Sequence, residues 1–179
     1  RTLAADPRVR YVPAAGIGVS AGRNAAIARA DGDIVFVTDD DCEVDPEALQ
    51  RLSRLLLSDA RIGIVFGNVV AGPHDVNLGF IPAYRRESPV VAHGIHEKHK
   101  VEGLSACMGL RKSVWKRLSG FDEMLGSGAP LRSGAETDFT IRALLAGFAV
   151  LEDPEVRVTH NGFRTWKEGF ELIARYWFG

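Results

Sequence analysis

Residues 34–46 read IVFVTDDDCEVDP, a short apolar run that ends directly in three consecutive aspartates. A continuous apolar run of this length is typical of a buried strand. Adjacent carboxylates repel one another and resist removal from water, so such a block is costly unless water or a cation reaches it. The segment therefore indicates either a solvated turn that caps the next helix or a site that binds a cation.

The composition limits the kinds of protein to which this segment can belong. The chain has 179 residues, 46% hydrophobic and 25% charged, as in a soluble globular protein of one domain. The formal net charge of -1 gives no support to general binding of nucleic acid. Two cysteines, Cys42 and Cys107, are too few for a disulfide framework, and no signal-peptide pattern or membrane-spanning apolar run is present. We therefore expect a cytoplasmic protein.

Short apolar runs alternate with helical patterns, which indicates an α/β domain with a mostly parallel sheet flanked by helices. Strands are predicted at residues 9–12, 34–38, 62–70, 104–110, 148–151 and 156–159. Helices are predicted at residues 20–30, 113–118, 136–146 and 166–177, and a further helix begins at Asp45-Pro46. Residues 71–102 have no periodic pattern, so we expect a long loop there.

The three aspartates lie where open α/β sheets bind ligands, at the carboxyl end of a strand. Asp39 and Asp41 are two positions apart, so both can project to one side and share a hard cation, while Asp40 points elsewhere. Carboxylate oxygens suit Mg²⁺ or Mn²⁺, and the open coordination positions can take substrate phosphates. A phosphatase of the haloacid-dehalogenase type also begins with such a strand, but Glu43 stands where that family has Thr or Val.

A second acidic cluster begins the predicted helix at residues 136–146. Glu136 and Asp138 lie in its first turn, where the positive end of the helix dipole stabilises carboxylates. Asp138 can pair with Arg142 four residues later, which is an ordinary surface arrangement. Glu136 has no such partner in the sequence, so it is suited to serve as a general base.

Four motifs follow one another in an order typical of one known family. The segment GVSAGRNAAIARADGDIVFVTDDDCEVDP has a turn, an Arg-Asn helix, a strand and an Asp-x-Asp motif, and LSACMGLRKSVWKRLSGFDEML has a strand, a helix and Gly-Phe-Asp-Glu. GAETDFTIRALLAG has the acidic pair before a helix, and VTH ends at His160. Together these segments resemble the inverting family 2 glycosyltransferases of the GT-A fold, which implies a Rossmann-like mixed, mostly parallel sheet.

The resemblance implies a role for each candidate residue. Asp39 and Asp41 would be the Asp-x-Asp pair, with Asp41 favoured as the direct metal ligand, and His160 would be a third ligand or a diphosphate contact. A lone histidine after a strand can also be purely structural. The implied substrate-binding residues are Arg23 and Asn24, beside the donor nucleotide, and Asp40.

The base motif departs from the family pattern. Aligning on the segment Thr137-Asp138-Phe139 puts Ala135 in the place of the usual Glu and Glu136 in the place of the catalytic Asp. We choose Glu136 as the base and keep Asp138 as its neighbour or substitute. Nothing before Val9 resembles the nucleotide-binding βαβ portion with which family members begin, so we expect residues 1–179 to form one GT-A-like domain without its first strands.

The implied reaction transfers a sugar from a nucleotide-diphosphate sugar to the hydroxyl of a saccharide or lipid-linked acceptor, with inversion and with Mn²⁺ or Mg²⁺. The altered base motif and the absent nucleotide segment keep a second hypothesis open, a noncatalytic GT-A-like domain that binds a saccharide or a partner.

The predicted C-terminal helix carries Trp166, Phe170, Ile173 and Trp177 at helical spacing, a pattern that usually packs into a core. The same face can instead contact a missing segment, a partner chain or the inner face of the membrane.

Overall fold

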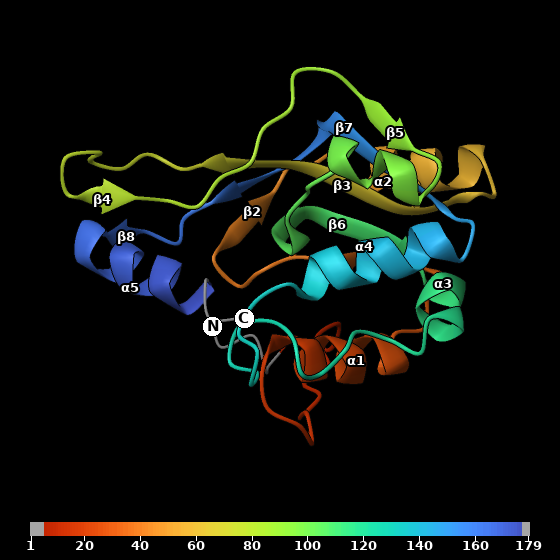
Figure 1. Ribbon diagram of the computed structural model, residues 1–179, viewed down its shortest axis with the longest axis horizontal. Helices are drawn as coiled ribbons and strands as arrows, with labels where there is room; N and C mark the ends of the chain where they lie inside the picture. Colours follow the sequence, from red (N-terminus) through yellow and green to blue (C-terminus); the bar gives the residue numbers. More distant parts are fainter. Residues whose placement is uncertain (1–5, 177–179) are drawn as a thin grey trace.

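The computed structural model describes residues 6–176 as a mixed sheet between layers of helices (Figure 1). Six strands are joined in the order β1-β6-β3-β7-β2, with β5 paired to β7, and β4 and β8 form a separate pair. The strands are β1 Ile34–Val37, β2 Cys42–Val44, β3 Ile62–Ala71, β4 Gly79–Phe80, β5 Val90–Ala92, β6 Met108–Arg111, β7 Ala149–His160 and β8 Arg164–Thr165. The helices are α1 Val19–Arg29, α2 Ala48–Ser58, η2 Ile95–Lys100, η3 Ser105–Cys107, α3 Lys112–Arg117, α4 Ala135–Leu145 and α5 Trp166–Tyr176.

The strands that supply most of the sheet run in one direction. β3 and β7 pair in parallel along nearly their whole length, and β1 runs the same way because both β1 and β3 are antiparallel to β6. The shorter strands β2, β5 and β6 run the other way. The sheet is therefore mixed, as the sequence predicts.

Each face of the sheet has its own core because side chains alternate along a strand. Ile64 and Phe66 of β3 pack in the cluster that contains Phe139 of α4, whereas Val65 packs with Leu52 of α2 on the other face. All five side chains are almost completely buried. This two-sided burial explains why β3 reads as a continuous apolar run rather than an alternating one.

The short strand β2 positions the candidate site. After β1 the chain turns through the three aspartates, and β2 then pairs with the end of β7, where Cys42 lies opposite His160. The backbone N–H of Asn161 donates to the carbonyl of Asp41 at 2.8 Å. Two segments far apart in the sequence, the aspartate turn and the end of β7, are thereby fixed side by side.

Several predicted elements differ from the structure. The strand expected at 104–110 is the 3-10 turn η3 followed by β6, and the long loop expected at 71–102 contains β4, β5 and η2. The strand expected at residues 9–12 is not formed. The two strands expected at 148–151 and 156–159 are the single strand β7, which passes Pro154 at a register shift opposite β3. The helix expected at Asp45 begins at Ala48, because Asp45 accepts backbone hydrogen bonds from Glu47 and Ala48 and so forms a turn first.

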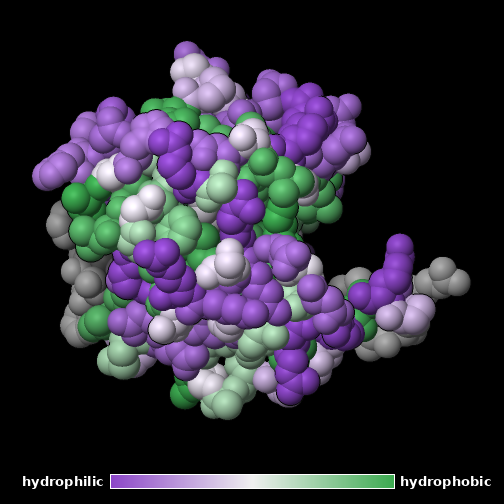
Figure 2. Space-filling model, turned by 90° about the vertical axis from the view of Figure 1, so that its right-hand side faces the viewer, coloured by the Kyte–Doolittle hydropathy of each residue, from purple (hydrophilic) through white to green (hydrophobic). Residues whose placement is uncertain are grey.

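The C-terminal helix α5 lies against the β4–β8 pair at one end of the molecule (Figure 1). Three of the side chains expected on its apolar face are not buried as core: Phe170 is 72% exposed, and Trp166 and Ile173 are half exposed. Trp177 lies outside the described residues. Among residues 6–176, no helix has the length and apolar character that a membrane crossing needs. The opposite end, where α3 lies, presents a largely hydrophilic surface with smaller hydrophobic areas between (Figure 2).

Candidate active site

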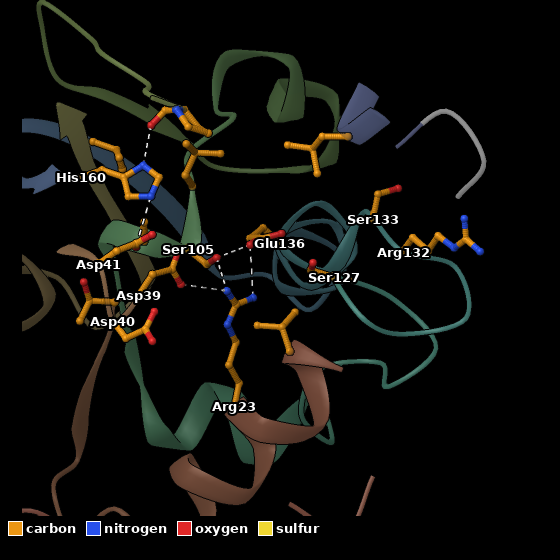
Figure 3. A pocket seen from close by; sticks show the side chains of 18 of the residues that line it. Arg23, Asp39, Asp40, Asp41, Ser105, Ser127, Arg132, Ser133, Glu136 and His160 are labelled. Atoms are coloured by element: carbon orange, nitrogen blue, oxygen red, sulfur yellow. Dashed lines mark hydrogen bonds and ion pairs between the residues drawn. The ribbon is translucent and has the colours of Figure 1, made fainter. Parts of the chain in front are cut away.

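A cavity of about 660 Å³ opens at the carboxyl end of β1. Its walls are the aspartate turn, the end of β7, the N-terminal parts of α1 and α4, and the segments 104–106 and 126–134 (Figure 3). Of the eight residues that the sequence predicts for the site, six line the cavity: Arg23, Asp39, Asp40, Asp41, Glu136 and His160.

Asp41 and His160 form one side of the cavity. Nε2 of the buried His160 ring lies 3.2 Å from Oδ1 of Asp41, and Nδ1 lies 2.7 Å from the carbonyl oxygen of Pro82. A carbonyl oxygen only accepts, so Nδ1 carries a hydrogen, and in the neutral ring the lone pair of Nε2 then points toward the carboxylate. Two facing acceptors require a proton or a cation between them.

The surroundings of this pair fit a hard divalent cation. A carboxylate oxygen and an imidazole nitrogen are suitable donors for Mn²⁺, and the carbonyl that holds Nδ1 fixes the ring as in many metal sites. A Cβ atom at Gly162 would lie 2.3 Å from Oδ2 of Asp41 and 2.5 Å from Nε2 of His160, so only glycine leaves this space open. Cys42 is the third residue whose ligand atom lies within 4.8 Å of the others. Burial raises the pKa of its thiol, which disfavours the thiolate that binds metals.

Asp39 is turned toward Arg23 rather than into this cluster. Its Oδ1 lies 3.8 Å from Nη2 of Arg23. Burial raises the pKa of Asp39, the nearby charge of Arg23 lowers it, and the charge of Asp41 raises it further, with a net rise. Asp40 is exposed, and in Figure 3 its side chain points away from the Asp41–His160 pair, as the sequence predicts.

Glu136 stands across the cavity, in the first turn of α4. Gly134 caps this helix with a φ of 82°, in the left-handed region that favours glycine. Oε1 of Glu136 accepts a hydrogen bond from Nη1 of Arg23 at 3.2 Å and another from the hydroxyl of Ser105. The side chain is 28% exposed, so the carboxylate is held by partners but remains open to the cavity.

Asp138 and Asn24 do not line this cavity. Asp138 accepts two hydrogen bonds from Arg142, the pairing that the spacing of four predicts. The side-chain amide of Asn24 bonds to both backbone polar groups of Phe121 and to the indole of Trp115. The amide is therefore used to hold the segment that follows α3.

Several residues that line the cavity are not predicted from the sequence, chiefly Ser105, Arg132 and Arg164. Ser105 precedes β6, the strand that pairs with β1, so its place beside the aspartate turn could have been inferred from that pairing alone. Arg132 lies in the Gly-rich segment 126–134, whose glycines mark a loop close to the start of α4. No signal in the sequence places Arg164 here.

Comparisons with known proteins bear on the family and the fold of the chain. The family described as glycosyl transferase family 2 matches residues 1–118. No curated protein matches the chain by sequence. The fold is similar to that of TarS from S. aureus, residues 1–349, with 16% identity and a TM-score of 0.58 over 87% of this chain and 43% of that one. A TarS structure in complex with UDP-GlcNAc gives the same identity and TM-score.

A mannosyltransferase from Pyrobaculum calidifontis, in complex with GDP-Man and Mn²⁺, is also similar, with 20% identity and a TM-score of 0.51 over 80% of this chain and 36% of that one. A mycobacterial protein has 18% identity and a TM-score of 0.54 over 95% of this chain and 50% of that one. The chain thus spans half or less of the length of these relatives.

Proposed function

The chain belongs to glycosyl transferase family 2 and has the mixed α/β fold of GT-A enzymes, and from this premise we propose that it transfers a sugar from a nucleotide-diphosphate sugar to an acceptor hydroxyl, with inversion at the anomeric carbon. One observation carries the proposal. Glu136 and the Asp41–His160 pair stand on opposite sides of a single cavity. A base and a site for the leaving diphosphate are the two parts that a one-step displacement needs.

Asp41 and His160 would hold Mn²⁺ or Mg²⁺ together with the donor diphosphate. The bound ion neutralises the charge that builds up on the leaving group. Asp39, which faces Arg23, would contribute negative charge to this side, and Asp40 would contact the donor. That relatives are described in complex with UDP-GlcNAc and with GDP-Man and Mn²⁺ supports a donor of this class.

Glu136 would remove the proton from the acceptor hydroxyl. The acceptor oxygen then forms a bond to the anomeric carbon from the face opposite the diphosphate, and the bond between that carbon and the diphosphate oxygen breaks. The nucleoside diphosphate leaves with the electron pair, and the proton stays on Glu136. We propose a saccharide or lipid-linked acceptor, because attack needs only a hydroxyl beside the base.

The test measures release of nucleoside diphosphate from a panel of UDP- and GDP-sugars, with Mn²⁺ and with EDTA. We expect Asp41→Ala to abolish metal-dependent release without unfolding the protein, and Glu136→Gln to leave donor binding intact while lowering turnover about 10²- to 10⁴-fold. Glu43→Ala is the matched control, because Glu43 is an exposed acid on β2, outside the cavity, whose carboxylate accepts a hydrogen bond from Asn161. Full activity in Asp41→Ala would rule out the proposed site. A wild-type protein that binds no nucleotide with Mn²⁺ would favour the noncatalytic domain.

A further inference from the structure

The contacts of Glu136 fall on only one of its two carboxylate oxygens. Arg23 Nη1 and the Ser105 hydroxyl both donate to Oε1, and no bond to Oε2 is present among the described residues. In Figure 3 the three side chains converge from three separate elements, α1, η3 and α4. The carboxylate is therefore tied at one oxygen, while the other is available to a substrate.

Arg23 is itself held on several sides. Its side chain is only 10% exposed, and its guanidinium lies 5.9 Å from the centroid of the Phe121 ring. It donates to Ser105 as well as to Glu136, and it faces Asp39. A guanidinium held in this way presents donors in a fixed fork, which fixes the direction of the groups that it binds.

Ser105 links these two residues. Its hydroxyl accepts from Arg23 Nη2 and donates its hydrogen to Glu136, so its donor and one acceptor position are both used. The backbone just before it is anchored as well, because the N–H groups of Glu102 and Gly103 donate to the buried carboxylate of Glu152. Ser105 is therefore held in position both by the anchored backbone that precedes it and by the hydrogen bonds of its own hydroxyl.

We propose that Arg23 and Ser105 are positioning residues that orient Glu136 through Oε1, so that Oε2 faces the acceptor hydroxyl. The inference rests on the proposed function, in which Glu136 is the base. It gives Arg23 a task on the acceptor side of the reaction, in place of the donor contact that the sequence resemblance implies. Both residues act on turnover through Glu136 and not through binding of the donor.

The proposal predicts a separation of kinetic constants. Ser105→Ala and Arg23→Lys each lower kcat about tenfold to a hundredfold, because a carboxylate that is no longer fixed spends less time in the reactive geometry. The KM for the donor and the dependence on Mn²⁺ stay unchanged in both variants. Ser58→Ala is the matched control: Ser58 is an exposed hydroxyl at the end of α2, outside the cavity, that donates to the carbonyl of Leu55, so its kcat should stay unchanged.

A double-mutant cycle tests whether the two residues act through the base. In a Glu136→Gln background, Ser105→Ala and Arg23→Lys should cause no further loss of the residual turnover, since residues that act as a unit are not additive. Multiplicative losses, or a raised donor KM in Arg23→Lys, would overturn the proposal and leave the proposed function intact. Wild-type turnover in Glu136→Gln would instead overturn the assignment of the base. Urea unfolding of each variant separates these effects from a loss of fold.

Discussion

Two glutamates in this molecule have the same kinds of hydrogen-bond partner, but one opens to the cavity and the other is buried. Glu136 meets an arginine and a hydroxyl, Arg23 and Ser105, at one oxygen, and it is 28% exposed in the cavity. Glu152 of β7 also meets an arginine and a hydroxyl, but it is 2% exposed.

The carboxylate of Glu152 is used on both oxygens. Oε2 accepts from the hydroxyl of Tyr84 at 2.8 Å and from Nε of Arg86. Oε1 accepts from the backbone N–H groups of Glu102 and Gly103, at 2.5 Å and 2.6 Å. These bonds tie both ends of the chain segment between β4 and η3 to the central sheet. The two glutamates thus differ in the number of engaged oxygens and in access to the cavity rather than in the types of partner, and these two differences suit Glu136 to the proposed role of base.

The largest expected effect is the loss in the free energy of unfolding on replacing Glu152, compared with the loss on replacing Glu136. Glu152→Ala leaves Arg86 and two backbone N–H groups without their buried acceptor, so we expect a loss of about 3–5 kcal/mol in the free energy of unfolding. Glu136→Ala leaves Arg23 with Ser105 and Asp39 as partners and opens onto the cavity, so it should cost less, about 1–3 kcal/mol. Urea unfolding of the two variants measures both values. Equal losses would mean that the two networks have the same structural role.

A smaller loss is expected at Asn24, a polar side chain near the cavity whose bonds are used as fully as those of Glu152. Asn24→Ala leaves the indole of Trp115 and the backbone of Phe121 without partners, which should cost about 1–3 kcal/mol. The KM for the donor should not change. The matched control is Asn77→Ala, because Asn77 is exposed and its side chain donates to the carboxylate of Asp75. A raised donor KM at wild-type stability would instead support a nucleotide contact.

Asp138 is a close reference for Glu136, because it is an acid of the same helix two residues away that lies outside the cavity. Asp138→Asn should retain turnover within about twofold and cost less than about 0.5 kcal/mol, as expected of an i,i+4 pair with Arg142. Steady-state measurement of kcat in Asp138→Asn and in Glu136→Gln decides which of the two acids is the base. If Asp138→Asn is inactive and Glu136→Gln is active, the base has been assigned two residues too early.

The last effect concerns the pH dependence of stability at Asp39, a carboxylate whose charged form is disfavoured by burial. Because its pKa is raised above the ordinary 3.8, the folded protein holds this proton more tightly than the unfolded chain does. Its contribution to stability is therefore largest at low pH and is lost as the pH rises from 3.8 through the raised value. Asp39→Asn should remove this slope and stabilise the protein at neutral pH, by less than about 1 kcal/mol because the group is partly exposed. Urea unfolding from about pH 4 to about pH 7 measures it. A wild-type protein that gains stability over this range relative to the variant would contradict the sign.

The sequence predicts those parts of the site that local rules govern. The apolar strand before the aspartates and the carboxylates in the first turn of a helix are visible in short windows, and Asp39 and Glu136 do line one cavity. The tasks of Arg23 and Asn24 could not be found in this way, because their partners lie 113 and 97 residues away. Periodicity likewise predicts that α5 is amphipathic but not whether anything covers its apolar face.

The pairing of β2 with the end of β7 also has a thermodynamic consequence. It brings Asp41 beside His160. The loop that it closes is as long as the separation of 118 residues between Glu43 and Asn161. An ion shared by Asp41 and His160 would act as a cross-link between the first and last parts of the main sheet, and cross-links over long loops restrict the unfolded chain most. Since the unfolded chain has no such site, cation affinity and fold stability would be linked. A melting temperature that rises with Mn²⁺ concentration would then report, without any substrate, that the proposed metal site has formed.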